Sequence, residues 1–440
     1  MSRPGSGGTV PADPPRVDPA LKAALEAELD AAVALRHALH RDPRLSGDEA
    51  DSRDLVLAAL ADVTTAPELV ADTGAMVRLG APARDGRPAV AVRAELDALP
   101  VVERTGLPYS ATGPAAHVCG HDVHVAALVA VVRAMARVGP EHRGPAPLLA
   151  VFQPREEKAP SGASDVATDP RFAAHEVGAM LGVHVQPELP RGTVSVRGGP
   201  VNASADEIEI EVHGRGGHGG YPHRTRDPVL ALAQIVAGVH HIVSRRVDPM
   251  VAGVITLGQM EAGSAPNVVP ETATARGTVR ALDADRDELL AALREVVEGT
   301  ARAYGCTATL TVVPNEPAVV NDEALARTVA RALGSRRSTD AGADDGGAGI
   351  GGLVLDTTFR SCGADDFSHY GEVLPSLMLF VGTAAAGTTP GAGPGLHHPE
   401  FSPDDAMVGE VARALLAAAI AAGAALAPAA DPVTAAAPNG

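Results

Sequence analysis

Aromatic residues and cysteines are scarce in this sequence of 440 residues. Phe, Tyr and Trp together make up 2% of the chain and Trp is absent, so walls that could stack on a large aromatic group are sparse. The three cysteines, Cys119, Cys306 and Cys362, are odd in number and scattered. Disulfide-stapled folds need paired cysteines, so we expect no disulfide framework and a protein of the reducing cytoplasm.

Positive charge is also in short supply. The chain has 36 Lys and Arg against 54 Asp and Glu, which gives a net charge of -18 at pH 7. Nucleic acids and anionic membranes attract proteins of the opposite sign, so we expect neither as a partner. The global charge does not exclude a small anionic substrate, because a local pocket can carry the opposite sign.

Continuous apolar stretches are few. The N-terminus is rich in Pro and Gly and lacks the apolar stretch of a signal peptide. One long apolar stretch, residues 414–430, raises the question of a membrane span. It is mostly alanine, contains Gly423 and Pro428, and follows Glu410 and Arg413. We interpret it as the last helix of the fold and a frayed tail.

The length and the 45% hydrophobic content predict two or three domains with sizeable cores. Segments with helical spacing are 19–40 and 124–135, and strand-like segments are 75–79, 89–93, 148–152 and 180–185. This alternation predicts an α/β fold in which helices cover both faces of a mostly parallel sheet. Residues 1–16 and 428–440 are expected to be disordered.

The pattern changes after residue 199. Strand-like segments at 208–212, 251–257, 272–279 and 307–313 and helical segments at 228–243 and 285–304 follow in the order β-α-β-β-α-β. This order is that of a ferredoxin-like α+β sandwich. We therefore predict that a domain of residues 202–314 is inserted into a first domain formed by residues 17–201 and 315–427. A helix at 322–333 resumes the first domain, and the Gly/Ala/Asp-rich segment 335–352 is expected to be a mobile loop.

Candidate metal ligands concentrate between the strand-like and helical segments of the first domain. His117, Cys119, His121 and His124 fall within eight residues. A thiolate and an imidazole two positions apart can hold a metal from a strand-to-helix loop. The alternative is a buried structural cysteine beside a histidine that caps a helix.

Two adjacent carboxylates, Glu156 and Glu157, follow the strand at 148–152. One can bind metal while the other moves protons. The alternative is a solvated acidic turn, but ligands of open α/β sheets gather at the carboxyl ends of strands.

Several histidines are further candidates. His184 ends a strand, which suits either a ligand or a structural histidine, and His397 and His398 lie in a Gly/Pro-rich loop. His218 is flanked by glycines, which can present an imidazole on a tight turn or form a turn in which the histidine is incidental. The separated segments predict a metal centre that closes only when the chain folds.

These segments, taken in order, resemble one family. The matching residues are 35–43, 92–100, 119–122, 152–157, 182–184, 216–219, 267–270, 277–280, 363–367 and 396–401. They resemble the co-catalytic metallopeptidases of the aminoacylase and carboxypeptidase-G superfamily. Within it, the match is to the amidohydrolase branch of hippurate hydrolases, N-acyl-amino-acid amidohydrolases and auxin-conjugate hydrolases. The fold implied is zinc-exopeptidase-like with an inserted lid and dimerisation domain.

The resemblance also implies the roles of individual residues. It implies that Cys119, His121, Glu157, His184 and His397 bind two divalent metal ions, Zn or Mn. Glu156 would be the catalytic acid/base, and Arg280 would bind the substrate carboxylate. His218 and Asn267 would stabilise the oxyanion, with His218 reaching the site of the partner subunit in a homodimer.

The sequence therefore predicts a cytoplasmic amidohydrolase that cleaves an N-acyl amino acid with a metal-activated water. A hydrolase of dipeptide, carbamoyl or ureide bonds and a non-catalytic binding protein are the alternatives. Arg155 departs from the small residue that usually precedes the base in this family. A guanidinium there is expected to favour the ionised form of Glu156 and weaken it as a base.

Overall fold

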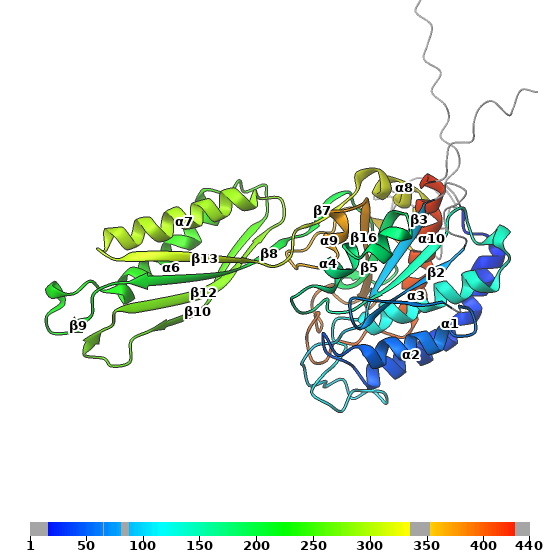
Figure 1. Cartoon of the computed structure of the whole chain (residues 1–440), viewed down its shortest axis with the longest axis horizontal. Coiled ribbons are helices and arrows are strands. Elements are labelled where there is room, and N and C mark those ends of the chain that lie inside the picture. Colours follow the sequence, from blue (N-terminus) through cyan, green and yellow to red (C-terminus); the bar gives the residue numbers. More distant parts are fainter. Residues whose placement is uncertain (1–15, 65, 81–87, 335–352, 427–440) are drawn as a thin grey trace, which may run out of the picture.

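Two lobes of unequal size make up the protein in a computed structural model (Figure 1). The structure describes residues 16–64, 66–80, 88–334 and 353–426. The expectations for residues 1–15, for the loop 335–352 and for the tail 428–440 lie outside these residues.

The large lobe is built on an eight-stranded sheet with the order β1-β2-β4-β3-β5-β16-β6-β15. Its strands are β1 (Glu68–Val70), β2 (Gly74–Leu79), β3 (Ala89–Glu95), β4 (Leu148–Gln153), β5 (Val177–Pro190), β6 (Thr193–Ser195), β15 (Val354–Asp356) and β16 (Ser376–Ala384). The central strands β4, β3, β5 and β16 are mutually parallel, whereas β2 and β6 join them antiparallel. The predicted α/β class with a mostly parallel sheet is confirmed.

Helices cover both faces of this sheet. The main ones are α1 (Pro19–Arg41), α2 (Ala50–Leu60), α3 (His121–Arg137), α8 (Glu323–Leu333) and α10 (Ala406–Leu426), and the short ones include α4 (Gly162–Ala167), α5 (Pro170–Ala174) and α9 (Ser368–Gly371). Strand β3 is buried along its whole length, and its side chains alternate between the two layers. Val90 and Val92 pack against the main helices on one face of the sheet. Ala91 belongs to the core on the other face, together with Phe172 and Tyr370.

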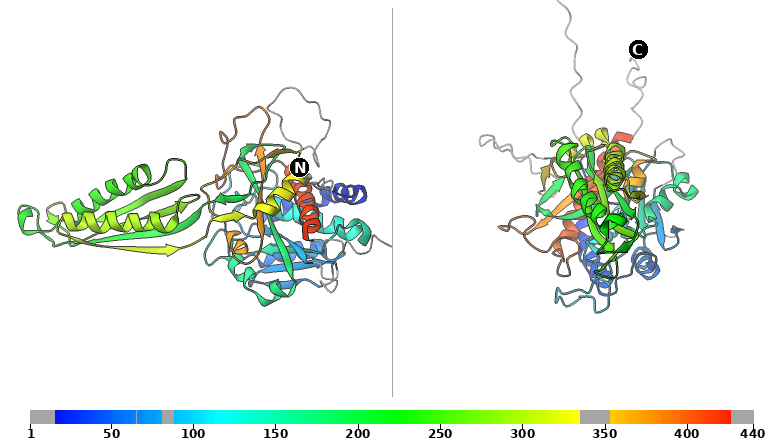
Figure 2. Two further views of the ribbon diagram at one scale, coloured as in Figure 1. Left: turned by 90° about the horizontal axis from the view of Figure 1, so that it is seen from above. Right: turned by 90° about the vertical axis from the view of Figure 1, so that its left-hand side faces the viewer.

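The small lobe follows the predicted β-α-β-β-α-β order. It contains β8 (Ser204–His213), α6 (Pro228–Arg245), β10 (Gly253–Ala262), β12 (Thr272–Ala281), α7 (Arg286–Ala303) and β13 (Thr307–Pro314). The antiparallel sheet has the order β10-β12-β8-β13, and both helices pack on one face (Figure 2). Strand β10 extends five residues beyond the predicted 251–257, past an irregularity in pairing between Leu257 and Gln259.

The two ends of the small lobe meet at its junction with the large lobe. The chain enters from β7 (Gly199–Asn202), which pairs with β14 (Val319–Asn321). Backbone hydrogen bonds join Ala205 to Asn315 and Glu316 at 3.1 and 2.8 Å. The small lobe is thus continuous with the large one through neighbouring strands rather than through a free linker.

Among the described residues, two helices, α6 and α10, are long and apolar enough to cross a membrane by length and composition. In α10, 83% of the most apolar window is buried, against 33% in α6. Helix α10 packs on α3, α8 and β5, and α6 lies over the sheet of the small lobe. The apolar residues of α10 therefore have partners within the fold.

We predict that Leu415→Ala destabilises the protein strongly. Leu415 is fully buried in α10, and removing a buried leucine side chain costs about 2–5 kcal/mol. Leu69→Ala is the matched control, because Leu69 is 48% exposed and is expected to change the free energy of unfolding by less than about 0.5 kcal/mol. Urea denaturation followed by circular dichroism measures both, and an unchanged midpoint for Leu415→Ala would show that α10 is not a core helix.

Candidate metal centre

The loop that carries Cys119 and His121 turns sharply into α3. Gly120 has φ = +94°, and a Cβ at this position would lie 2.4 Å from Cγ2 of Val185. Only glycine tolerates both the left-handed backbone and this close contact. Helix α3 therefore begins at His121, three residues before the predicted 124–135 segment.

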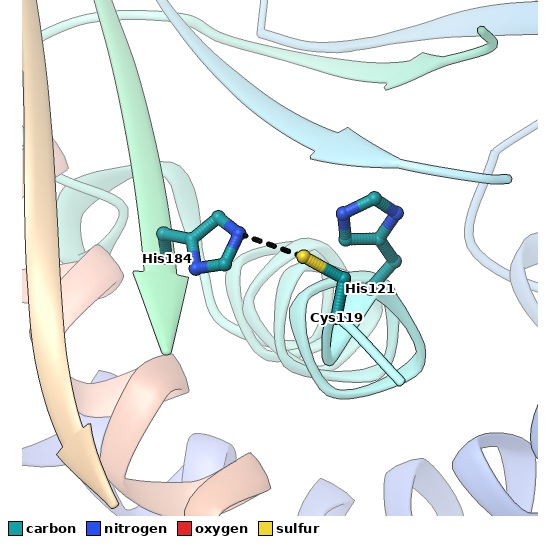
Figure 3. A group of neighbouring side chains, drawn as sticks. All are labelled: Cys119, His121 and His184. Carbon is teal, nitrogen blue, oxygen red and sulfur yellow. Dashed lines mark hydrogen bonds between the residues drawn. The ribbon is translucent and has the colours of Figure 1, made fainter. Parts of the chain in front are cut away.

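His184 approaches Cys119 from strand β5 (Figure 3). Its Nδ1 donates a hydrogen bond to the carbonyl oxygen of Val185 at 2.7 Å, which leaves the lone pair on Nε2 free to bind a cation. Nε2 lies 3.4 Å from Sγ of Cys119. Both side chains are buried.

Asp97 aligns the next two candidate ligands. Its backbone oxygen accepts a hydrogen bond from Nδ1 of His121 at 2.9 Å, and its Oδ2 accepts one from the backbone N–H of Glu157 at 2.9 Å. Nε2 of His121 consequently faces Glu156 at 3.7 Å and Glu157 at 3.9 Å. Histidine ligands commonly donate their second N–H in this way, which fixes the ring.

His397 reaches the same cluster from the C-terminal part of the chain. Its backbone N–H donates to the oxygen of Val118 at 2.8 Å, and its φ is +67°. Its Nε2 lies 3.4 Å from Oε1 of Glu157. The neighbouring His398 is not part of the cluster among the described groups, and its Nδ1 accepts from the backbone N–H of Glu400 at 3.2 Å.

The donor atoms fit divalent cations. Four overlapping groups have all their donor atoms within 4.8 Å of one another: Cys119, His121 and His184; Cys119, Glu157 and His397; His121, Glu156 and Glu157; and Glu156, Asp365 and Asp366. Within the described ranges, the buried Nε2 of His121 and Oε1 of Glu157 have no hydrogen-bond partner. Unpaired buried polar atoms are costly, and thiolate, imidazole and carboxylate are the donors that zinc and similar metals bind.

The protonation of the cluster also indicates a site that requires positive charge. Burial and the neighbouring charges of Glu157 and Glu156 raise the pKa of the Cys119 thiol well above its ordinary value. Burial alone would lower the pKa of His121, but the hydrogen bond to Asp97 and nearby carboxylates raise it to about 10. Without a metal, a proton on His121 therefore supplies the positive charge that the carboxylates require.

Glu156 lies at the edge of the donor groups. Burial, then Glu157, Asp365 and Asp366, raise its pKa well above the ordinary range, while Arg93 lowers it. A carboxyl group with a raised pKa suits a role in proton transfer.

Arg93 is a central residue to which sequence reasoning assigned no role. It is fully buried on β3 and contacts the carboxylates of Glu95, Asp365 (2.9 Å) and Asp366 (2.7 Å). Burial and Asp365 raise the pKa of Asp366 to about 6, although Arg93 opposes them. The four residues lie in the segments 92–100 and 363–367, which the sequence analysis had singled out. One basic and three acidic side chains in these two segments were the signal that could have indicated an ion-pair cluster.

The expectation for Arg155 is wrong. Its guanidinium contacts Asp72 at 3.2 Å and Asp165, so it is turned away from Glu156. The backbone of Arg155 is left-handed, with φ = +52°, and its N–H donates to Glu49. The cation that acts on Glu156 is Arg93.

A cavity of about 430 Å³ opens beside the donor groups. Its lining includes Cys119, Glu156, Glu157, His184 and His397 from the cluster, Asn202, Asn315, Ser361 and Phe380 from the surroundings, and Arg280 from β12 of the small lobe. The predicted substrate-binding Arg280 thus shares one cavity with the predicted base and with all of the predicted ligands except His121.

A family model described as peptidase family M20/M25/M40 matches residues 91–420. The chain belongs to this family. N-acetylcysteine deacetylase of Bacillus subtilis is 32% identical over 379 residues, which span 85% of this chain and 92% of that protein. N-acetyldiaminopimelate deacetylase of Halalkalibacterium halodurans is 31% identical over 357 residues, which span 80% and 90%.

Solved structures agree with this membership. A Bacillus subtilis protein described as a dinuclear metal binding peptidase from the M20 family superimposes with a TM-score of 0.71 and 27% identity, over 90% of this chain and 98% of that one. The family and fold predicted from the sequence are confirmed. Hydrolysis of a linear amide bond, the predicted reaction class, is the reaction of the named deacetylases.

Two predicted site residues of this M20 chain lie far from the cluster. His218 on β9 (Gly217–His218) and Asn267, next to β11 (Val268–Val269), are exposed together at the distal tip of the small lobe (Figure 1). The backbone N–H of Gly219 donates to the oxygen of Asn267 at 2.8 Å. Neither residue lines the cavity, so one chain does not bring them to its own metal centre.

We predict that Asp97→Asn lowers metal affinity about 10–100-fold, the usual effect of removing an outer hydrogen-bond partner. The amide cannot replace both the charge near His121 and the acceptor for Glu157. Competition with a chelator measures the affinity, and Asp72→Asn is the control because that side chain is 87% exposed. Equal affinities in the two variants would contradict the role given to Asp97.

Proposed function

We propose that this M20 chain hydrolyses the amide bond of small N-acyl amino acids and uses two divalent metal ions, Zn or Mn. The observation that carries the proposal is one cavity that joins four of the five metal-ligand side chains, Cys119, Glu157, His184 and His397, to an adjacent carboxylic acid and an arginine. The names of relatives support the substrate class, because both deacetylases described above remove an acetyl group from an amino acid.

In this proposal Cys119, His121, Glu157, His184 and His397 hold the metals. Cys119, His121 and Glu157 each belong to two of the donor groups, which supports two neighbouring ions rather than one. When bound, such ions polarise a carbonyl and make a water molecule acidic near neutral pH.

Glu156 moves the proton. Its Oε2 takes a proton from the attacking water, and the same carboxylic acid then gives the proton to the leaving nitrogen of the amino acid. Its place beside the metal-ligand groups and its raised pKa support both halves of this task. Asp97 and Arg93 keep the neighbouring groups in place.

Arg280 is proposed to bind the substrate carboxylate from β12, where its side chain lines the cavity. Phe380 is the one aromatic side chain among the lining residues that the structure describes. This supports a small acyl group, such as acetyl, over a large aromatic one.

His218 and Asn267 are proposed to act in the cavity of a second copy of the chain. They are exposed at the tip of the small lobe beside His223 and Arg224, so this tip carries basic groups. The cavity, by contrast, is lined with carboxylates. A homodimer in which the tip of one chain reaches the cavity of the other would supply the oxyanion donors that each cavity lacks.

We predict different losses from Glu156→Gln and Glu157→Gln. Glu156→Gln should retain metal and reduce kcat on N-acetyl-L-methionine by about 100–10,000-fold, because it removes proton transfer. Glu157→Gln should lose metal and activity together, since it removes a ligand. Elemental analysis and steady-state kinetics on the same preparations measure both.

The other outcomes are informative. Near-normal turnover by Glu156→Gln would defeat the mechanism, and metal loss in that variant alone would reverse the two roles. A wild-type protein that binds metal yet hydrolyses no N-acyl amino acid would defeat the proposed substrate class.

We also predict that two inactive variants restore activity when mixed. His218→Ala and Glu156→Gln each lack one essential group, but a mixed dimer contains one intact site. Equal mixing should recover about a quarter of wild-type activity, because half of the dimers are mixed and each has one working site. No recovery, with co-purification of differently tagged chains showing that mixed dimers form, would place the action of His218 within its own chain.

A further inference from the structure

We propose that Asn202 selects N-acyl amino acids whose side chain carries a hydrogen-bonding group. This inference rests on the proposed function and names the substrate class of the same cavity. Asn202 ends β7, where its backbone pairs with Val319 of β14 and bridges to Ser361. Its side chain lines the cavity and is buried, with 8% exposed.

The carboxamide of Asn202 lacks the bonds that a structural asparagine makes. Among the residues that the structure describes, its Oδ1 has no hydrogen-bond partner although the atom is buried. An unsatisfied buried polar group destabilises a fold by roughly 1–3 kcal/mol. A leucine of similar volume would avoid this cost, so the fold itself does not require the amide here.

Asn321 gives the contrast within the adjoining strand. Its Nδ2 donates to the oxygens of Arg197 and Met378 at 2.8 and 2.9 Å, and its Oδ1 accepts from the N–H of Met378 at 2.7 Å. Asn321 therefore serves the structure, whereas Asn202 keeps its hydrogen-bonding capacity for a molecule in the cavity.

Asn202 lies close to the part of the cavity where the amino-acid half of the substrate is proposed to bind. Arg280 lies opposite Ala205 in the β12–β8 ladder, and Ala205 also lines the cavity. Asn202 ends β7 and is three residues before Ala205, which lies near the start of β8. A substrate whose carboxylate binds Arg280 and whose amide faces Glu156 would direct its side chain along this wall.

The wall is polar but largely neutral. Asn315 and Ser361 line it together with Asn202. Glu316 also lines it, but its carboxylate already lies 2.9 Å from Nε2 of His369. The hydrogen bond to Glu316 raises the pKa of His369 to about 9, so a positive charge lies against this carboxylate at neutral pH. The wall thus favours an amide or hydroxyl group over an ammonium group on the substrate side chain.

The test compares N-acetyl-L-glutamine with N-acetyl-L-methionine, which have side chains of similar length and volume. The wild-type kcat/KM should favour glutamine about tenfold, because methionine leaves the carboxamide unpaired. Asn202→Leu should abolish this preference by lowering the value for glutamine while leaving that for methionine unchanged or higher. Asn202→Ala provides a second, smaller variant.

Stability measurements separate specificity from folding. Asn202→Leu should keep or raise the melting temperature, whereas Asn321→Leu should lower it and leave the substrate ratio unchanged. Hydrolysis of both substrates at a ratio that Asn202→Leu and Asn202→Ala do not change would overturn this inference and leave the proposed function standing. Hydrolysis of neither would overturn both.

Discussion

Buried negative charge is the constraint on which the rest of this site depends. Glu95, Glu156, Glu157, Asp365 and Asp366 crowd around the cavity and its floor, and Arg93 is the fully buried guanidinium among them. One guanidinium cannot neutralise five carboxyl groups, so burial either keeps some of them protonated or requires further cations. Burial together with this excess raises the pKa of the Cys119 thiol and of Glu156, whereas the hydrogen bond to Asp97 and the neighbouring carboxylates raise that of His121. The thiol, imidazole and carboxyl groups gathered here are well matched to divalent metal.

The backbone fixes the positions of the metal-ligand side chains around this buried charge. Parallel strands end at one edge of the sheet, and β4, β5 and the loop before α3 each deliver side chains there. Gly120 allows the loop to pass against Val185, and Asp97 joins His121 to Glu157. The ligands therefore owe their positions to backbone contacts and hydrogen bonds that involve no metal.

Much of this architecture was predictable because it is periodic. The alternation of apolar segments predicted three of the four central strands, β3, β4 and β5, and the order of elements in the small lobe, but it did not predict β16. Residue chemistry at strand ends predicted side chains that gather at the cavity. Side-chain direction was not predictable. Arg155 is adjacent to Glu156 in sequence, yet its left-handed backbone turns the guanidinium to Asp72 and Asp165. Arg93 is remote in sequence and acts on Glu156 through space. The separation of His218 from the cluster depends on the length of the small lobe, which no local pattern encodes.

The position of β16 has a consequence for how the protein is made. This strand lies between β5 and β6, although almost two hundred residues, including the whole small lobe, separate it from them in the chain. During synthesis, β5 and β6 emerge long before the strand that joins them, so the nascent sheet exposes unpaired edges for that time. His397 follows later still. The growing chain must therefore shield an unfinished sheet until its last quarter leaves the ribosome, and the cavity is completed only then.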